Sequence, residues 1–212
     1  MQYTIYQSMY PITEVFFDVE TKKLFSDIPD FDPAKLGVSI VSVYKRTIDE
    51  NYNEIEGVMQ SFWESDFETM WPVFSEAKRI IGFNTLRFDV LTLKPYAPTY
   101  FSKLPHFDIY AEIKKVSEHA AGLNAIAKET LDREKTDDGL NAVYYWEKHD
   151  DESLAKLKKY CEADVLITRD VYDHVLKNKL ILFKDKWNTL RNVPLDFSYP
   201  EEKYSDTQTS LF

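Results

Sequence analysis

FFDVET, residues 16–21, is the stretch of sequence that decides the fold, because it places two acids at the end of an apolar run. Residues 15–18 are predicted to form a buried strand. Asp18 and Glu20 are two residues apart, and side chains at that spacing point to the same face of a strand. Both carboxylates can then reach one metal ion. A strand end whose acids simply face solvent explains the pair equally well.

Two further acidic segments lie far along the chain. In YCEADV, residues 160–165, Tyr160 and Asp164 are four apart in a predicted helix and share one face of it. In GFNTLRFD, residues 82–89, Asp89 comes near the start of another predicted helix, where the helix dipole favours an acid. Each signal is weak alone. Four carboxylates from three segments are what two-metal hydrolysis of a phosphodiester requires.

Hydrophobic periodicity predicts an α/β domain with a mixed sheet of about five strands flanked by helices. The strands that follow residues 15–18 are predicted at 36–44, 55–63, 79–83 and 106–110, the first two as an antiparallel hairpin through a turn at 51–53. The helices are predicted at 67–78, 88–93, 123–131, 140–149 and 153–176. Pro72 is expected either to begin the first helix or to kink it.

The periodicity fades after about Asn188. Residues 192–209 are polar, contain two prolines and show no repeat, which is typical of an extended or flexible tail. We therefore expect a catalytic domain over residues 1–187 and a tail over residues 188–212.

Composition narrows the class of protein. The chain has 212 residues, 44% hydrophobic and 15% aromatic, enough for one large domain with a sizeable core. The sequence contains neither of two glycine-rich phosphate-binding motifs, G-x-x-x-x-G-K-[ST] and G-x-G-x-x-G. A single cysteine, no signal-peptide pattern and no apolar run of membrane-spanning length predict a cytoplasmic protein. The net charge of -10 is unusual for an enzyme of nucleic acids, because phosphate contacts normally rest on basic residues.

Taken together, the three acidic segments resemble the motifs of the DEDD superfamily of 3′–5′ exonucleases. FFDVET is similar to the first motif, GFNTLRFD to the second, and YCEADV to the third in the form that carries tyrosine. The resemblance covers about residues 12–180. HFDIYAEIKK and LNAIAKETL also resemble segments of a subgroup related to the exonuclease of family B DNA polymerases.

The resemblance implies an RNase H-like fold with the first strand at the centre of its sheet. It also implies two Mg²⁺ or Mn²⁺ ions about 4 Å apart, held by carboxylates and water. In that arrangement Asp18 bridges the ions, Glu20 and Asp164 complete the first, and Asp89 holds the second. Tyr160 positions the attacking water, and the product is a nucleoside 5′-monophosphate.

Other residues near these motifs carry weaker expectations. Substrate contacts are expected from Thr21, Phe83, Asn84 and Arg87. Core packing explains Phe83 better, whereas support of the second motif explains Asn84, and a solvated surface position explains Arg87, equally well. Cys161 is expected to pack and Glu162 to point away. Asp108, at a strand end, has a structural role by default, with support of the site as the alternative.

The last five residues, QTSLF, form a separate signal. They resemble the pentapeptide by which bacterial proteins bind the replicative sliding clamp. Leu211 and Phe212 would enter an apolar pocket while the Gln208 amide bonds backbone at its rim. Packing of Leu211 and Phe212 on their own domain is the alternative. Clamp binding would raise the local concentration of an acidic enzyme at DNA.

The sequence thus favours a metal-dependent 3′–5′ exonuclease of single-stranded or frayed DNA, acting in replication or repair. An RNA 3′–5′ exonuclease with the same site stays open, because the chemistry does not involve the 2′ position. A non-catalytic, clamp-bound adaptor is disfavoured because all five catalytic side chains are present. An RNase H-type endonuclease is disfavoured because the Tyr-x-x-x-Asp spacing is typical of exonucleases.

Overall fold

A five-stranded mixed sheet forms the centre of the protein, in the order β3-β2-β1-β4-β5. The computed structural model describes residues 11–133 and 139–200. β1 (Ile12–Thr21) is central and pairs antiparallel with β2 (Val38–Ile48), which pairs antiparallel with β3 (Glu54–Trp63). On its other side β1 pairs in parallel with β4 (Arg79–Gly82), and β4 pairs in parallel with β5 (His106–Asp108). The predicted mixed sheet is confirmed.

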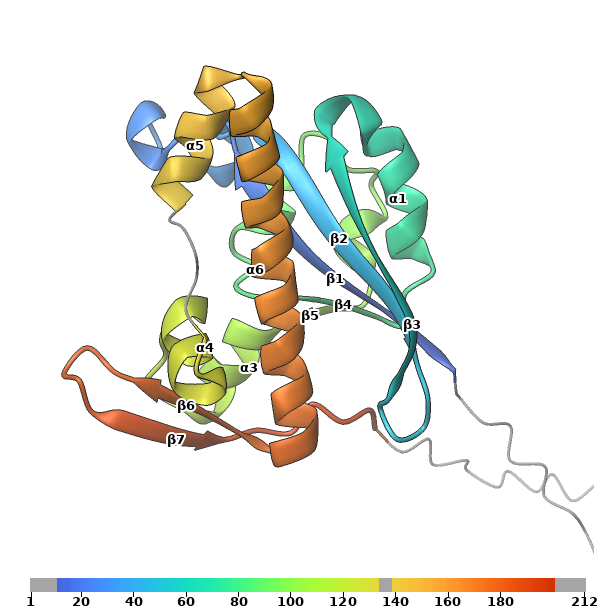
Figure 1. Cartoon of the computed structure of the whole chain (residues 1–212), viewed down its shortest axis with the longest axis vertical. Helices are drawn as coiled ribbons and strands as arrows, with labels where there is room; N and C mark the ends of the chain where they lie inside the picture. Colours follow the sequence, from blue (N-terminus) through green and yellow to red (C-terminus); the bar gives the residue numbers. More distant parts are fainter. Residues whose placement is uncertain (1–10, 134–138, 201–212) are drawn as a thin grey trace, which may run out of the picture.

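Helices cover both faces of this sheet (Figure 1). One face carries α1 and α2, and the other carries α3, α4 and the long α6, with α5 beside the first half of α6. The helices are α1 (Phe67–Ser75), α2 (Asp89–Leu93), α3 (Ile109–Val116), α4 (Leu123–Leu131), α5 (Gly139–Lys148) and α6 (Asp151–Asn178). Pro72 lies inside α1 rather than at its start.

The alternation of β1 separates two hydrophobic clusters. Val15, Phe17 and Val19 pack with the apolar side chains of α1, whereas Phe16 faces Val165 and Tyr172 of α6. The even-numbered residues of β1 therefore point toward α6, as the period of two requires. Glu14, Asp18 and Glu20 share that face with Phe16, so the position of α6 determines what surrounds these acids.

α6 lies along the even face of β1 and is fixed at both ends of the strand. In the N-terminal half of α6, the Cys161 thiol donates to the Asp18 carbonyl oxygen at 3.5 Å. Further along, the Tyr172 hydroxyl donates to Glu14 Oε1 at 2.8 Å. The Asp150 side chain caps the first turn by accepting from the Ser153 backbone N–H at 2.8 Å. The register of helix against strand brings Tyr160 and Asp164 to the end of β1.

The chain after α6 differs from the prediction of a tail that begins at residue 188. β6 (Leu180–Lys184) and β7 (Leu190–Pro194) form a separate antiparallel hairpin, and Leu195 and Phe197 are buried in the larger core cluster. β7 exposes most of its side chains, so its apolar periodicity is faint. Pairing with β6 and the burial of Val193, Leu195 and Phe197 order this segment.

None of the described helices is long and apolar enough to cross a lipid bilayer. The QTSLF segment, with Gln208, Leu211 and Phe212, lies outside the described residues.

Candidate active site at the end of β1

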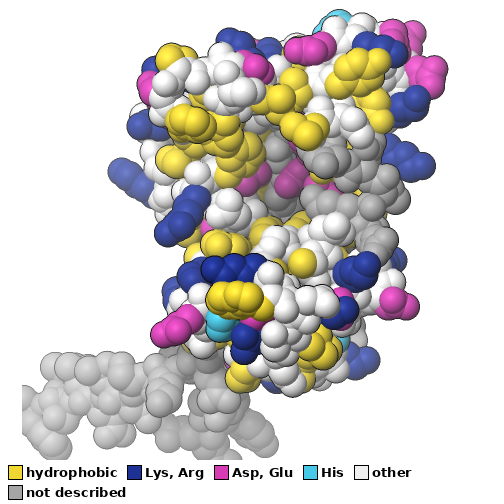
Figure 2. All heavy atoms as spheres, turned by 90° about the vertical axis from the view of Figure 1, so that its left-hand side faces the viewer, with side chains coloured by type: hydrophobic (Ala, Val, Ile, Leu, Met, Phe, Trp, Pro, Cys, Tyr) yellow, Lys and Arg dark blue, Asp and Glu magenta, His cyan; other side chains and the backbone are white. Residues whose placement is uncertain are grey.

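The five side chains that the sequence analysis selected line one pocket. Its volume is about 300 Å³, and it opens at the end of β1 between α2 and α6. Figure 2 shows this face of the molecule, with acidic side chains inside a central hollow. The lining includes Asp18, Glu20, Asp89, Tyr160 and Asp164. Residues from three segments that are about 70 positions apart in sequence thus share one site.

The two acids of β1 lie side by side at the floor of the pocket. Asp18 and Glu20 are both half-buried, and one oxygen of each lies within 4.8 Å of the other and of the Cys161 sulfur. The pairing of β1 with β2 shifts register between Glu20 and Thr21, so the regular ladder ends directly after the acidic pair. The strand therefore presents Glu20 at its last regular position and Asp18 two residues before it, on the same face.

Asp89 enters the pocket from the first position of α2. Its carboxylate accepts a hydrogen bond from the Val19 backbone N–H at 3.0 Å, which ties α2 to the strand between Asp18 and Glu20. Asp89 is only 3% exposed. Burial, with a smaller contribution from the negative charge of Asp108, raises the pKa of Asp89 to about 7. A buried acid with this pKa would be stabilised in its charged form by a cation.

The loop between β4 and α2 is held in place by Asp108. The Asp108 carboxylate accepts from the backbone N–H groups of Asn84 at 2.8 Å and Leu86 at 3.0 Å. It also caps α3 by accepting from Ala111 N–H at 3.2 Å. Asn84 has a φ of 63°, a conformation that asparagine tolerates better than most residues. Asp108 is therefore a positioning residue, because its carboxylate joins the loop before α2 to the first turn of α3.

Tyr160 and Asp164 project from successive turns of α6. The phenol is hydrogen-bonded to the Asp164 carboxylate. Burial, followed by the charges of Asp164, Glu20 and Asp18, raises the pKa of Tyr160 well above its ordinary value. Tyr160 is therefore a neutral hydroxyl at physiological pH, able to donate one hydrogen bond and accept others.

The residues between them on α6 behave as expected. Cys161 is fully buried, and burial together with the charges of Asp18 and Glu20 raises the pKa of its thiol. It is thus a packed thiol rather than a thiolate ligand. Glu162 is turned toward the sheet, where its carboxylate accepts from the Ser61 hydroxyl at 2.8 Å.

Three of the four expected substrate contacts line the same pocket, namely Thr21, Phe83 and Asn84. The Thr21 hydroxyl donates to the Lys23 carbonyl oxygen at 2.8 Å. Arg87 is exposed and lines an adjoining hollow of about 640 Å³, which shares Asp18, Phe83 and Asn84 with the first. Lys23 and Phe25 also line the pocket, and sequence reasoning missed both because the turn that places them has no motif.

Comparison with known proteins supports the architecture. The sequence model of the RNase_H superfamily matches residues 15–176, more than half of the chain. The chain belongs to the RNase H superfamily. The match begins within β1 and ends near the last turns of α6, so it includes the strand and the helix that supply most of the pocket.

Among solved structures, this RNase H superfamily chain is similar to the family B DNA polymerase from the hyperthermophilic archaeon Pyrobaculum calidifontis. The TM-score is 0.55 at 17% sequence identity, over 78% of this chain and 25% of the polymerase chain. This likeness concerns the fold, and the chain corresponds to about a quarter of the polymerase. A search of curated proteins finds no match.

The donor set of the pocket suits hard divalent cations. Four carboxylates converge, and Lys23 is the one cationic side chain among the described residues that line the pocket. Oxygen-rich, carboxylate-dominated sites favour Mg²⁺ and Mn²⁺. The acids of this RNase H superfamily chain are therefore fitted to hold metal, and one oxygen of Asp18 lies within 4.8 Å of one oxygen of Glu20.

Proposed function

We propose that the chain is a metal-dependent 3′–5′ exonuclease that hydrolyses phosphodiester bonds of single-stranded or frayed DNA to nucleoside 5′-monophosphates. One observation carries the proposal: Asp18, Glu20, Asp89, Asp164 and Tyr160 line a single pocket. Membership of the RNase H superfamily supports it, and the motif resemblance assigns it to the branch with tyrosine.

In the proposed mechanism, Asp18, Glu20, Asp89 and Asp164 would hold two Mg²⁺ or Mn²⁺ ions. Bound metal would lower the pKa of water and stabilise charge on the attacking and leaving oxygens. The neutral Tyr160 hydroxyl, fixed by Asp164, orients the attacking water toward the phosphorus. Asn84 and Phe83 at the pocket wall contact the terminal nucleotide, and Thr21 restrains the turn that carries Lys23.

RNA is the second candidate substrate. None of the proposed catalytic roles depends on the sugar 2′ position, so the same residues would hydrolyse either polymer. A DNA preference is favoured by the clamp-like QTSLF segment. Both polymers therefore belong in the first experiment.

The decisive test uses 5′-labelled single-stranded DNA and RNA with Mg²⁺ or Mn²⁺. Wild-type protein should give a ladder that shortens from the 3′ end. Asp164→Asn should abolish it, whereas Glu162→Gln, a matched acid on the same helix that faces Ser61, should retain it. Absence of degradation of both polymers with both metals, or equal loss in the two variants, would contradict the proposal.

We also propose that Gln208, Leu211 and Phe212 bind the sliding clamp, which would place the enzyme in replication or repair. The described chain supports an anchored origin for such a segment: the Tyr199 hydroxyl donates to Glu14 at 2.9 Å, and the Tyr199 backbone N–H donates to the Tyr52 hydroxyl at 3.3 Å. The proposal keeps two parts of the chain, a catalytic domain and a C-terminal tail. Hydrogen bonds to the catalytic domain extend as far as Tyr199.

The clamp proposal is tested by pull-down with the purified sliding clamp of the same organism. Leu211→Ala with Phe212→Ala should abolish capture. Thr209→Ala with Ser210→Ala changes the two variable positions of the motif and should leave capture intact. Undiminished capture of the first variant refutes the assignment.

A further inference from the structure

Three hollows follow one another along one face of the molecule. The carboxylate pocket shares Asp18, Phe83 and Asn84 with the second hollow. The second shares Tyr110 and Ala120 with a third hollow, of about 380 Å³, at the turn of the β6–β7 hairpin. The hairpin lies at the lower left of Figure 1, and the face that it borders is the one shown in Figure 2.

The geometry points to a track for single-stranded nucleic acid that leads from the carboxylate pocket to the β6–β7 hairpin, with Trp187 as a base-stacking platform. This inference rests on the proposed function, because it describes how a strand whose 3′ end is in the pocket continues across the surface. It adds a binding site that the three acidic motifs do not include.

Trp187 is exposed yet held by an ordered turn. The residue is 62% exposed. The carboxylate of Asp185 accepts from the backbone N–H groups of Trp187 at 2.9 Å and Thr189 at 3.1 Å. Arg191 donates to the same carboxylate from Nε at 2.8 Å. A turn fixed in this way presents the indole ring at little further cost in conformational entropy.

The groups around the indole suit a nucleic-acid strand. The Lys186 ammonium lies 4.4 Å from the centre of the Trp187 ring, and the His119 ring contacts the indole edge to face at 5.9 Å. Lys114 lines the same hollow and is exposed. Sequence-independent binding of single strands combines aromatic faces that stack on bases with cations that contact phosphates.

The charge of the lining residues changes along the track from acidic at the carboxylate pocket to basic at the hairpin, as binding of a phosphate backbone requires. Acids dominate the carboxylate pocket, whereas Arg87 lines the second hollow and Lys114 and Lys186 line the third. Asp185 is buried and paired with Arg191, so it faces into the turn. Glu118 is the one exposed acid among the residues that line the third hollow. The protein has a net charge of -10, so these cations form a local positive region on an acidic molecule. Such a region favours an anionic partner.

The test measures binding of a 5′-fluorescent oligothymidylate by anisotropy in EDTA, so that cleavage does not interfere. Trp187→Ala should weaken binding by about 5–150-fold, the range expected for loss of one base–aromatic stack. Trp187→Tyr should restore most of it. Lys186→Ala should reduce the slope of log affinity against log salt by about 0.7.

The matched control is Tyr100→Ala with Lys103→Ala, an exposed aromatic and an exposed lysine that line none of the three hollows. It should bind like wild type, and equal melting temperatures would show that all variants fold. Unchanged affinity of Trp187→Ala overturns the track. So does an altered sedimentation coefficient with unchanged affinity, which would identify the hairpin as a contact between copies of the chain.

Cleavage separates failure of the track from failure of the proposed function. With Mg²⁺ or Mn²⁺, Trp187→Ala should lower the preference for a long oligothymidylate over a dinucleotide. If wild-type protein cleaves neither, the nuclease proposal fails while the binding result still decides the track. If wild-type protein cleaves both and Trp187→Ala keeps the full preference, the track alone is wrong.

Discussion

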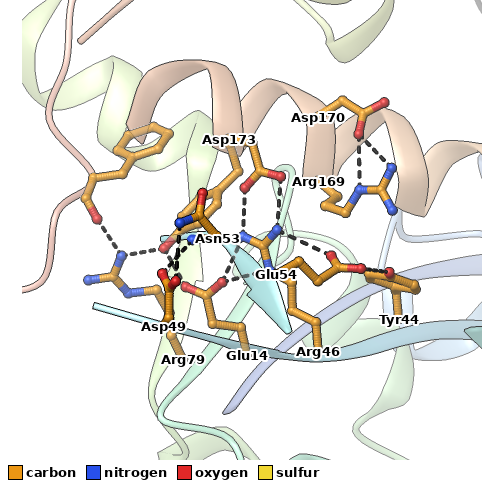
Figure 3. Close-up of polar contacts among 12 residues, drawn as sticks. Glu14, Tyr44, Arg46, Asp49, Asn53, Glu54, Arg79, Arg169, Asp170 and Asp173 are labelled. Atoms are coloured by element: carbon orange, nitrogen blue, oxygen red, sulfur yellow. Dashed lines mark hydrogen bonds and ion pairs between the residues drawn. The ribbon is translucent and has the colours of Figure 1, made fainter. Parts of the chain in front are cut away.

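Replacement of Arg46 by methionine should destabilise the protein strongly, because Arg46 is the centre of a buried charge network (Figure 3). Its side chain is 1% exposed and contacts Glu14, which is fully buried. The Arg46 Nε donates to Glu14 Oε2 at 2.9 Å, and its two terminal nitrogens donate to the two oxygens of Asp173 at 2.8 and 2.6 Å. The guanidinium also lies 4.9 Å from the centre of the Phe16 ring.

Methionine fills a similar volume but leaves the Glu14 carboxylate buried without its cation. Removal of one partner of a buried ion pair costs about 3–5 kcal/mol. For a chain of this size, each kcal/mol lowers Tm by about 2–4 °C, so the expected shift is about 6–20 °C. Addition of Glu14→Gln to Arg46→Met should recover at least about 2 kcal/mol, because the neutral amide oxygen still accepts from Tyr172 and Tyr199.

Urea denaturation of the two variants and wild type gives these free energies directly. Lys45→Met is the matched control, since Lys45 is the neighbouring residue and its pair with Glu76 is solvent-accessible. That control should cost less than about 1 kcal/mol. A loss below about 1 kcal/mol for Arg46→Met, or a double variant no more stable than the single one, would refute this account of the network.

Four further outcomes are expected. Mn²⁺ at 100 times its dissociation constant should stabilise wild-type protein by about 2.7 kcal/mol in a thermal-shift assay, and Asp18→Ala should remove most of this gain. Tyr160→Phe should lower kcat by about 10²-fold while the Mn²⁺-induced shift persists; an equal loss of both would assign the phenol a role in metal binding. Burial lowers the pKa of His106, so the unfolded state binds more protons below about pH 6.5 and stability falls there; urea titrations at pH 5.5 and 7.5 should show a smaller decline for His106→Gln. Gly82→Ala would place a Cβ in steric conflict with Thr85 Cγ2 and should reduce nuclease activity more than stability, whereas retained activity would show that the loop adapts.

The positions of the acids on their own elements could be predicted from the sequence. Asp18 and Glu20 share a face because a strand has a period of two, and Tyr160 and Asp164 share a face because a helix repeats every 3.6 residues. Both statements concern neighbours along the backbone. That Glu162 faces away follows from the same helical geometry, and its bond to Ser61 agrees with it.

The convergence of these elements could be expected only from motif resemblance. Asp89 reaches the backbone of Val19 across 70 residues, and no local pattern encodes that contact. The role of Asp108 could not be predicted from local sequence either, because its hydrogen bonds to Asn84 and Leu86 join two segments at the ends of parallel strands. Such contacts depend on how the strands pair and how α6 packs on them.

The sequence by itself determined the α/β class of the fold, the strand that carries the acidic pair, and the helix that carries Tyr160 and Asp164, because local backbone geometry fixes the periodicity of side chains. Only the tertiary structure decided that Asp89 is buried against β1 and that residues 190–197 form part of the folded unit. It also decided that Trp187 stands on an ordered turn beside two lysines. These features arise from pairing and burial between distant segments, where the favourable free energy comes from packing rather than from local sequence preference.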